Sequence, residues 1–121
     1  MRVLRRVTGP AVALETTLLC HGVPRDSATG LAERLATTVQ RAGAQAALVG
    51  VINGTPTVGL SSEELELLLG TPDVPKLNTS RLGLAIHRGE HGATTVSTTA
   101  EIAAAAGVRT FATGGIGGVH R

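Results

Sequence analysis

Apolar residues along this chain follow two rhythms, one typical of buried strands and the other typical of helices. The segment Ala11–Leu19 is apolar on both faces, as in a parallel strand that helices cover from both sides. The segment Ala46–Ile52 has the same character. Between them, Asp26 or Ser27 can cap a helix that runs to about Ala42, because apolar residues recur there at every fourth position. The apolar stripe of this helix consists of Leu31, Leu35 and Val39.

Turn and cap signals mark the elements that follow. Asn53-Gly54 is typical of a two-residue type I′ turn and predicts a hairpin into Thr55–Val58. Ser61 and Glu64 match a capping box, which predicts a helix that continues to Gly70. The remaining expected elements are an extended piece over Val74–Leu77, a helix over Ser80–His87, a short strand or loop over Gly92–Val96, a helix over Ser97–Ala106 and a strand over Val108–Ala112.

This alternation of strands and helices predicts an α/β fold. We expect a single α/β domain over residues 1–121, because the sequence contains no linker, repeat or low-complexity stretch. The arrangement expected is a layered α/β/α one with a mixed, mostly parallel sheet and right-handed crossovers.

Composition narrows the class of protein. The net charge of +2 is too small and too scattered to form a basic groove, and Phe111 is the single aromatic residue available for stacking on a base. Cys20 is the single cysteine, so no disulfide can form within the chain. No apolar run reaches the length of a membrane helix or a signal peptide. We therefore expect a cytoplasmic protein with no nucleic-acid or membrane partner.

Two charged residues are candidates for chemistry. Glu15 is the one charge in the first apolar run, so it lies either at the carboxyl end of a strand, facing a cleft, or on an edge strand facing solvent. Lys76 is the single lysine among 11 basic residues, in a sequence that otherwise uses arginine. A compact ammonium with a tunable pKa would explain that choice, and chance retention on the surface is the alternative.

The last eleven residues carry four glycines within five positions. Such a loop lets backbone amides approach an anion or a flat ring closely, which suggests a phosphate or small-ligand site. It is not a Rossmann signature, because a pattern beginning at Gly115 would need glycine where His120 stands. A flexible turn is the alternative interpretation.

A second motif, His87-Arg-Gly-Glu-His91, matches the H-x-x-E-H letters of a metalloprotease class. That chemistry requires both histidines on one helical face, and Gly89 stands between them. We therefore interpret the motif as a polar helix end followed by an exposed loop.

Several segments together resemble one enzyme family. They are Ala13-Leu-Glu-Thr-Thr17, His21-Gly-Val-Pro24, Val58-Gly-Leu60, Lys76, Gly92-Ala-Thr-Thr-Val96 and Phe111-Ala-Thr-Gly-Gly-Ile-Gly-Gly-Val-His-Arg121. In this order they are similar to the N-terminal part of pseudouridine-5′-phosphate glycosidase, also called the indigoidine synthase A-like family. The final block is highly specific, whereas the others are weak one by one.

The resemblance implies a C-glycosidase, a hydrolase or lyase that reversibly cleaves the carbon–carbon glycosidic bond of pseudouridine 5′-phosphate to uracil and ribose 5-phosphate. It implies Mn²⁺ as cofactor and a homotrimer. By position, it makes Glu15 the proton donor, and Lys76 and the backbone of Val96 substrate-binding groups. The further pocket residues implied are Thr95, Gly114, Gly115 and His120. We expect Glu15 and the glycine loop to converge on one sugar phosphate.

The sequence departs from the family in two ways. Asn78-Thr-Ser-Arg81 stands where the family commonly has a Ser-Arg-Arg-Asp run. The family's chains are also more than twice as long, and their metal-binding aspartate and imine-forming lysine lie beyond the equivalent of Arg121. We therefore expect the fold to be incomplete relative to the family and the chain alone to be inactive. The alternative is a non-catalytic module that binds a sugar phosphate or acts with a partner.

Overall fold

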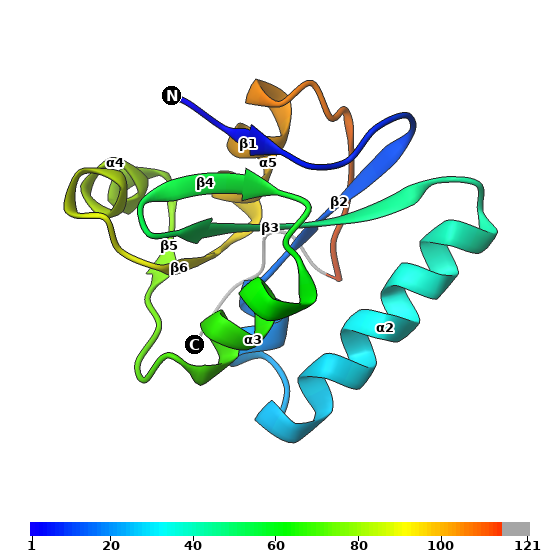
Figure 1. The fold of residues 1–121 in the computed structure, drawn as a ribbon, viewed down its shortest axis with the longest axis horizontal. Helices are drawn as coiled ribbons and strands as arrows, with labels where there is room; N and C mark the ends of the chain where they lie inside the picture. Colours follow the sequence, from blue (N-terminus) through cyan, green and yellow to red (C-terminus); the bar gives the residue numbers. More distant parts are fainter. Residues whose placement is uncertain (115–121) are drawn as a thin grey trace, which may run out of the picture.

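The computed structural model describes residues 1–114 and places a seven-stranded sheet between two groups of helices (Figure 1). The strands are β1 Leu4–Arg5, β2 Ala11–Glu15, β3 Gln45–Ile52, β4 Thr55–Val58, β5 Lys76–Leu77, β6 Gly92–Thr94 and β7 Thr110–Ala112. The helices are α1 Thr17–His21, α2 Arg25–Arg41, α3 Ser62–Gly70, α4 Thr79–Arg88 and α5 Val96–Ala105. Within the described residues, every helix is too short or too polar to span a membrane.

β3 is the central strand. On one of its edges it pairs with β4 in an antiparallel hairpin, and β1 continues the sheet beyond β4. Its other edge is shared by β2, which pairs with its first half, and β6, which pairs with Gly50 and Val51. β7 then extends the sheet beyond β2, and β5 extends it beyond β6. Four of these six pairings are parallel, which confirms the predicted mixed and mostly parallel sheet.

Successive side chains of β3 point to opposite faces of the sheet and so contribute to two separate cores. Ala47, Val49 and Val51 point into the larger core, which α4 and α5 cover, whereas Leu48 packs on the opposite face. The helical residues of the larger core are Leu82, Ala85, Ile102 and Ala103. The smaller core joins the helices of the other face through Leu19, Ala28 and Leu65. Helices therefore cover both faces of the sheet, as the α/β/α prediction requires.

The first strand ends earlier than its apolar run suggested. β2 stops at Glu15, and the apolar residues beyond it form α1, so the expectation of a strand to Leu19 was wrong. The reason is a change of direction at Thr16, which has helical dihedrals and whose buried hydroxyl donates to the carbonyl of Val49 at 2.8 Å. Leu19 is then carried into the core under α2 and α3.

The start of α2 also differs from the sequence-based expectation. The helix begins at Arg25, directly after Pro24, and neither Asp26 nor Ser27 caps it. Pro24 precedes the helix with φ −57° and ψ 141°, and its carbonyl accepts the amide of Ser27 at 2.9 Å, which opens the first turn without a side-chain cap.

Two local predictions are confirmed. Asn53 and Gly54 both have positive φ, 48° and 76°, as a type I′ turn demands, and they join β3 to β4. Ser61 and Glu64 form the predicted capping box at the start of α3. The segment Val74–Leu77 becomes a strand only over its last two residues, because only these pair with β6.

Candidate functional site

The carboxyl ends of four strands converge at one place in the sheet. β2 is parallel to β3 and β6 is antiparallel to it, so these two strands run toward each other along the same edge of β3. β7 runs with β2, and β5 runs with β6, so their carboxyl ends face the same junction. Ligands of open α/β sheets bind outside strand carboxyl ends, where chain segments leave the sheet. The topology therefore marks this junction as the candidate site.

Buried threonine hydroxyls hold the junction together. The carbonyl of Val49 accepts hydrogen bonds from Thr16 at 2.8 Å and from Thr94 at 2.7 Å. The amide of Thr94 donates to the hydroxyl of Thr16 at 2.9 Å, which links the end of β2 directly to the end of β6. Thr99 of α5 donates to Thr94 at 2.8 Å. Because all four residues are buried, this network fixes where the segments after both strands begin.

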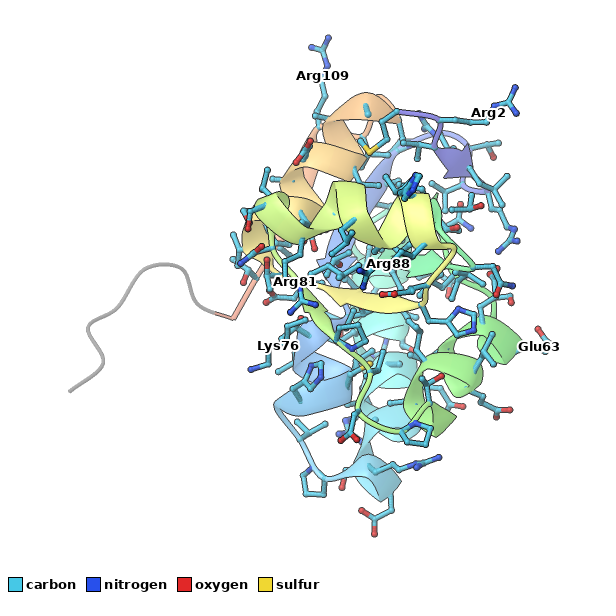
Figure 2. The ribbon with its side chains drawn as sticks, turned by 90° about the vertical axis from the view of Figure 1, so that its left-hand side faces the viewer. Arg2, Glu63, Lys76, Arg81, Arg88 and Arg109 are labelled. Carbon is cyan, nitrogen blue, oxygen red and sulfur yellow. The ribbon has the colours of Figure 1, made fainter. Side chains whose placement is uncertain are left out.

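A hollow of about 310 Å³ lies on the surface at this junction. It brings together three residues that the sequence singled out, Glu15, Lys76 and Gly114, from three segments far apart in the chain. Figure 2 shows the Lys76 side chain on the outside of the molecule, below Arg81. The remaining lining residues are Thr17, Leu18, His21 and Gly22.

Glu15 is half-buried at the end of a strand that has neighbours on both sides. This position settles the choice left open by the sequence in favour of the strand end and against an edge strand. Thr113, which follows β7, donates to Oε1 of Glu15 at 2.7 Å. A carboxyl group held by one oxygen keeps a fixed orientation and can still exchange a proton through the other.

Thr95 and Val96 lie at the junction but outside the lining of the hollow. Thr95 is the residue before α5, and Val96 is the first residue of that helix, whose amide finds no partner inside the helix. The hydroxyl of Thr95 donates to the carbonyl of Leu77 at 3.3 Å, so the start of α5 is joined to the strand that carries Lys76. The two remaining predicted site residues, Gly115 and His120, lie outside the described residues.

His21 also lines the hollow, although the sequence pointed to it only as part of the segment His21-Gly-Val-Pro24. It is the last residue of α1, and its Nε2 donates to the carbonyl of Val74 at 2.8 Å. A signal was present, because a histidine placed six residues after a strand-end carboxylate can return to the same cleft through one short helix. Its significance depended on the strand ending at Glu15.

The H-x-x-E-H motif does not form a metal site. α4 ends at Arg88, and Gly89 has φ 67°, so His87 and His91 are not one helical turn apart on a common face. His91 accepts the amide of Asn53 through Nδ1 at 2.9 Å, which gives it a role in the hairpin instead.

Mn²⁺, the cofactor implied by the resemblance, would need several oxygen or nitrogen ligands close together. Among residues 1–114, no three side chains of the types His, Cys, Asp and Glu are grouped so that they could hold a metal ion. The described part of the chain therefore does not fit the metal by itself.

The architecture is that of an α/β protein with a surface hollow at a place where such proteins bind ligands. The hollow lies where two parallel strand pairs, β2 with β7 and β5 with β6, meet at their carboxyl ends. Comparison with known sequences identifies it further: the chain belongs to the indigoidine synthase A-like family, whose model matches residues 3–121. It is 50% identical over 111 residues to a pseudouridine-5′-phosphate glycosidase of Chloroflexus aurantiacus, and 44% identical over 112 residues to that of a Nocardioides species. These matches cover 91% and 93% of this chain but 36% of each relative, so the chain spans about a third of their length.

Solved structures give the same result. An indigoidine synthase A-like protein of Thermotoga maritima superposes with a TM-score of 0.89 at 34% identity, over 98% of this chain and 41% of that one. The prealnumycin C-glycosynthase AlnA, in complex with ribulose 5-phosphate, superposes with a TM-score of 0.83 at 35% identity, over 97% of this chain and 41% of its own.

Proposed function

We propose that this chain forms the part of a pseudouridine-5′-phosphate glycosidase that binds the sugar phosphate and supplies the proton donor. The observation that carries the proposal is the meeting of Glu15, Lys76 and Gly114 in one hollow at the strand ends. The relatives named pseudouridine-5′-phosphate glycosidase support the reaction, and the neighbour with bound ribulose 5-phosphate supports a sugar phosphate as the ligand class.

In this proposal Glu15 protonates the ring oxygen of the ribose and so opens the sugar. The bond between C1′ and that oxygen breaks, water adds to C1′, and the proton that this water loses returns to Glu15. The bond between C1′ and the uracil carbon then breaks as the new C1′ hydroxyl becomes the aldehyde of ribose 5-phosphate, and the proton of that hydroxyl passes to the uracil carbon. The hydrogen bond from Thr113 to Oε1 keeps the carboxyl group of Glu15 in one orientation, which is what a general acid needs to reach one atom of its substrate.

Lys76 binds the phosphate in the same proposal. Its side chain is exposed at the rim of the hollow, and the described residues place no carboxylate within ion-pair distance of it. An ammonium that no protein carboxylate neutralises can attract an anionic ligand. In the same proposal Glu15 faces the sugar as the proton donor, and Lys76 faces the phosphate as the binding cation.

Calorimetric titration with ribose 5-phosphate tests the binding half of the proposal. We expect Lys76→Ala to weaken binding by at least about tenfold, as loss of a charge-assisted contact does. Arg109→Ala is the matched control, because it also removes one exposed cation but lies at a separate end of the molecule (Figure 2). Equal effects of the two variants would mean that the titration reports only general electrostatic attraction.

Uracil release from pseudouridine 5′-phosphate tests the chemical half. A release that disappears in Glu15→Gln, with binding of ribose 5-phosphate retained, supports the proton-donor role. Binding of ribose 5-phosphate without any release agrees with the expected inactivity of the chain alone, and it fits equally well the non-catalytic module that the sequence left as the alternative.

A further inference from the structure

We propose that His21 is a positioning residue that fixes the backbone of Lys76 relative to Glu15. The inference rests on the proposed function, because it concerns how the same hollow is assembled. Its basis is the hydrogen bond from Nε2 of His21 to the carbonyl of Val74 at 2.8 Å. This bond joins the segment that follows Glu15 to the segment that leads into Lys76.

The two ends of this bond are close to the two functional groups along the chain. On one side, Thr16 anchors the start of α1 to the sheet directly after Glu15, and His21 ends the same helix. On the other side, Val74 is buried and stands two residues before Lys76. A carbonyl oxygen can only accept, so the bond requires a proton on Nε2 of His21. The neutral ring and the protonated ring both satisfy that requirement.

The segment before Lys76 has few other attachments. β5 is only two residues long, and Asp73 just ahead of it has φ 51°, a left-handed conformation that is unusual for a residue with a side chain. The amide of Ala93 donates to the carbonyl of Pro75 at 3.0 Å and ties this segment to β6. His21 supplies the tie on the opposite side, toward β2. Together the two bonds hold the backbone of Lys76 between the two halves of the junction.

The turn after His21 is built to place that side chain. A Cβ added to Gly22 would lie 2.9 Å from the carbonyl oxygen of Leu18, which already accepts the amide of Gly22 at 3.0 Å. Any side chain there would push the last turn of α1 apart and move His21 away from Val74. The absence of a side chain at Gly22 therefore helps to keep His21 within hydrogen-bond distance of Val74.

Side-chain replacements that differ in reach test the proposal. In His21→Gln the amide nitrogen is as many bonds from the backbone as Nε2 of histidine, so it can still donate to Val74, whereas His21→Asn is too short. His21→Ala removes the donor completely. His87→Ala is the matched control, because His87 is an exposed histidine at the last turn of α4 and makes no side-chain hydrogen bond in the described structure.

Two measurements are made on each variant of the full chain: the backbone amide resonances of Lys76 and its neighbours by NMR, and the affinity for ribose 5-phosphate by calorimetry. We expect His21→Ala and His21→Asn to shift the Lys76 amide and to weaken binding about three- to tenfold. We expect His21→Gln and His87→Ala to stay close to wild type in both. If glutamine at position 21 keeps the Lys76 amide resonance and the affinity near their wild-type values and asparagine does not, a general loss of stability cannot explain the difference.

The outcomes separate this inference from the proposed function. If wild type does not bind ribose 5-phosphate, the proposed function fails, and the NMR comparison still decides whether His21 positions Lys76. If His21→Ala does not fold, the comparison of His21→Gln with His21→Asn decides instead. An unchanged Lys76 amide in His21→Asn, or equal effects of asparagine and glutamine, would overturn the inference.

Discussion

The two faces of the sheet are packed to very different degrees. On the face covered by α4 and α5, the core residues are fully or almost fully buried, and α5 packs closely through small side chains such as Ala103 and Thr99. On the face covered by α2 and α3, Ala28 is the only buried residue of the 17-residue helix α2. A hollow of about 190 Å³ remains between these helices and the sheet, lined by apolar residues such as Leu14, Leu48 and Leu65 and by polar ones such as Glu33 and Ser61.

The difference between the two faces also divides the candidate site into two halves. The junction threonines Thr94 and Thr99 belong to strands and helices of the closely packed face, and they position the β5 and β6 side of the site. Glu15 and His21 are linked through α1, whose Leu19 packs in the smaller core on the other face. The hollow at the strand ends therefore joins a tightly packed half to a loosely packed half. The bond from His21 to Val74 spans the two halves.

The largest expected effect is the loss of stability caused by a cavity in the closely packed face. Ile102→Ala should lower the free energy of unfolding by about 2–5 kcal/mol, because Ile102 is completely buried and a cavity is left behind. Leu35→Ala, on half-buried α2, should cost less than about 1.5 kcal/mol, since partly exposed apolar surface loses less on truncation. Urea denaturation measures both, and equal costs would contradict the difference between the faces.

The second expected effect concerns the thiol of Cys20 in α1, next to the less closely packed face. Burial raises the pKa of Cys20 from 9.0 to about 11. A shift of two pKa units leaves about 100-fold less thiolate at pH 8, so a thiol reagent should react about 100-fold more slowly with the folded chain than with the chain in denaturant. A reaction as fast as in the unfolded state would show that this face opens readily around α1.

A third pair of variants adds volume to each face. Ala103→Leu should destabilise the protein by about 1–3 kcal/mol, because Ala103 is buried in the larger core and extra atoms there force the surrounding side chains to move. Ala36 is exposed at the hollow between α2 and the sheet, so Ala36→Leu adds the same atoms where there is room, and we expect a change of less than about 0.5 kcal/mol or a small gain in stability. Thermal and urea unfolding would report both. A large loss in Ala36→Leu would mean that the hollow is not free to accept a side chain.

The smallest expected effect is a pH dependence at the edge of the less closely packed face. Burial alone would raise the pKa of Glu64, but hydrogen bonds from Arg6 and from the backbone and side chain of Ser61 outweigh it and lower that pKa below 4.5. A lowered pKa means that Glu64 adds stability above pH 4.5 and loses this contribution as pH falls through its value in the folded protein.

Unfolding free energies of wild type and Glu64→Gln between pH 3 and 7 measure this contribution. Wild type should be the more stable protein near neutral pH, and the difference should shrink at the acid end. The effect is small because Arg6 is exposed and solvent screens the pair. A difference that stays constant over the whole range would indicate loss of the capping box rather than loss of charge.

Local sequence signals predicted most of the secondary structure. The hairpin at Asn53-Gly54 and the capping box at Ser61 were predictable because each depends on residues adjacent in the chain. The strand expected to reach Leu19 was wrong, because apolar character alone does not distinguish a buried strand from a buried short helix. The hydrogen bond that accompanies the turn of the chain at Thr16 has its acceptor at Val49. These two residues are far apart in the sequence, so no local pattern could predict their contact.

The sequence by itself determined the family and the alternating α/β layers, and it singled out Glu15 and Lys76 as candidates, because these are carried by residue types and their order. Only the tertiary structure decided that these two residues share one hollow with Gly114, since this follows from β2 and β6 approaching each other along one edge of β3. The structure alone also gave His21 its partner at Val74. Such contacts depend on strand direction and register, which emerge only when all the strands pair at once.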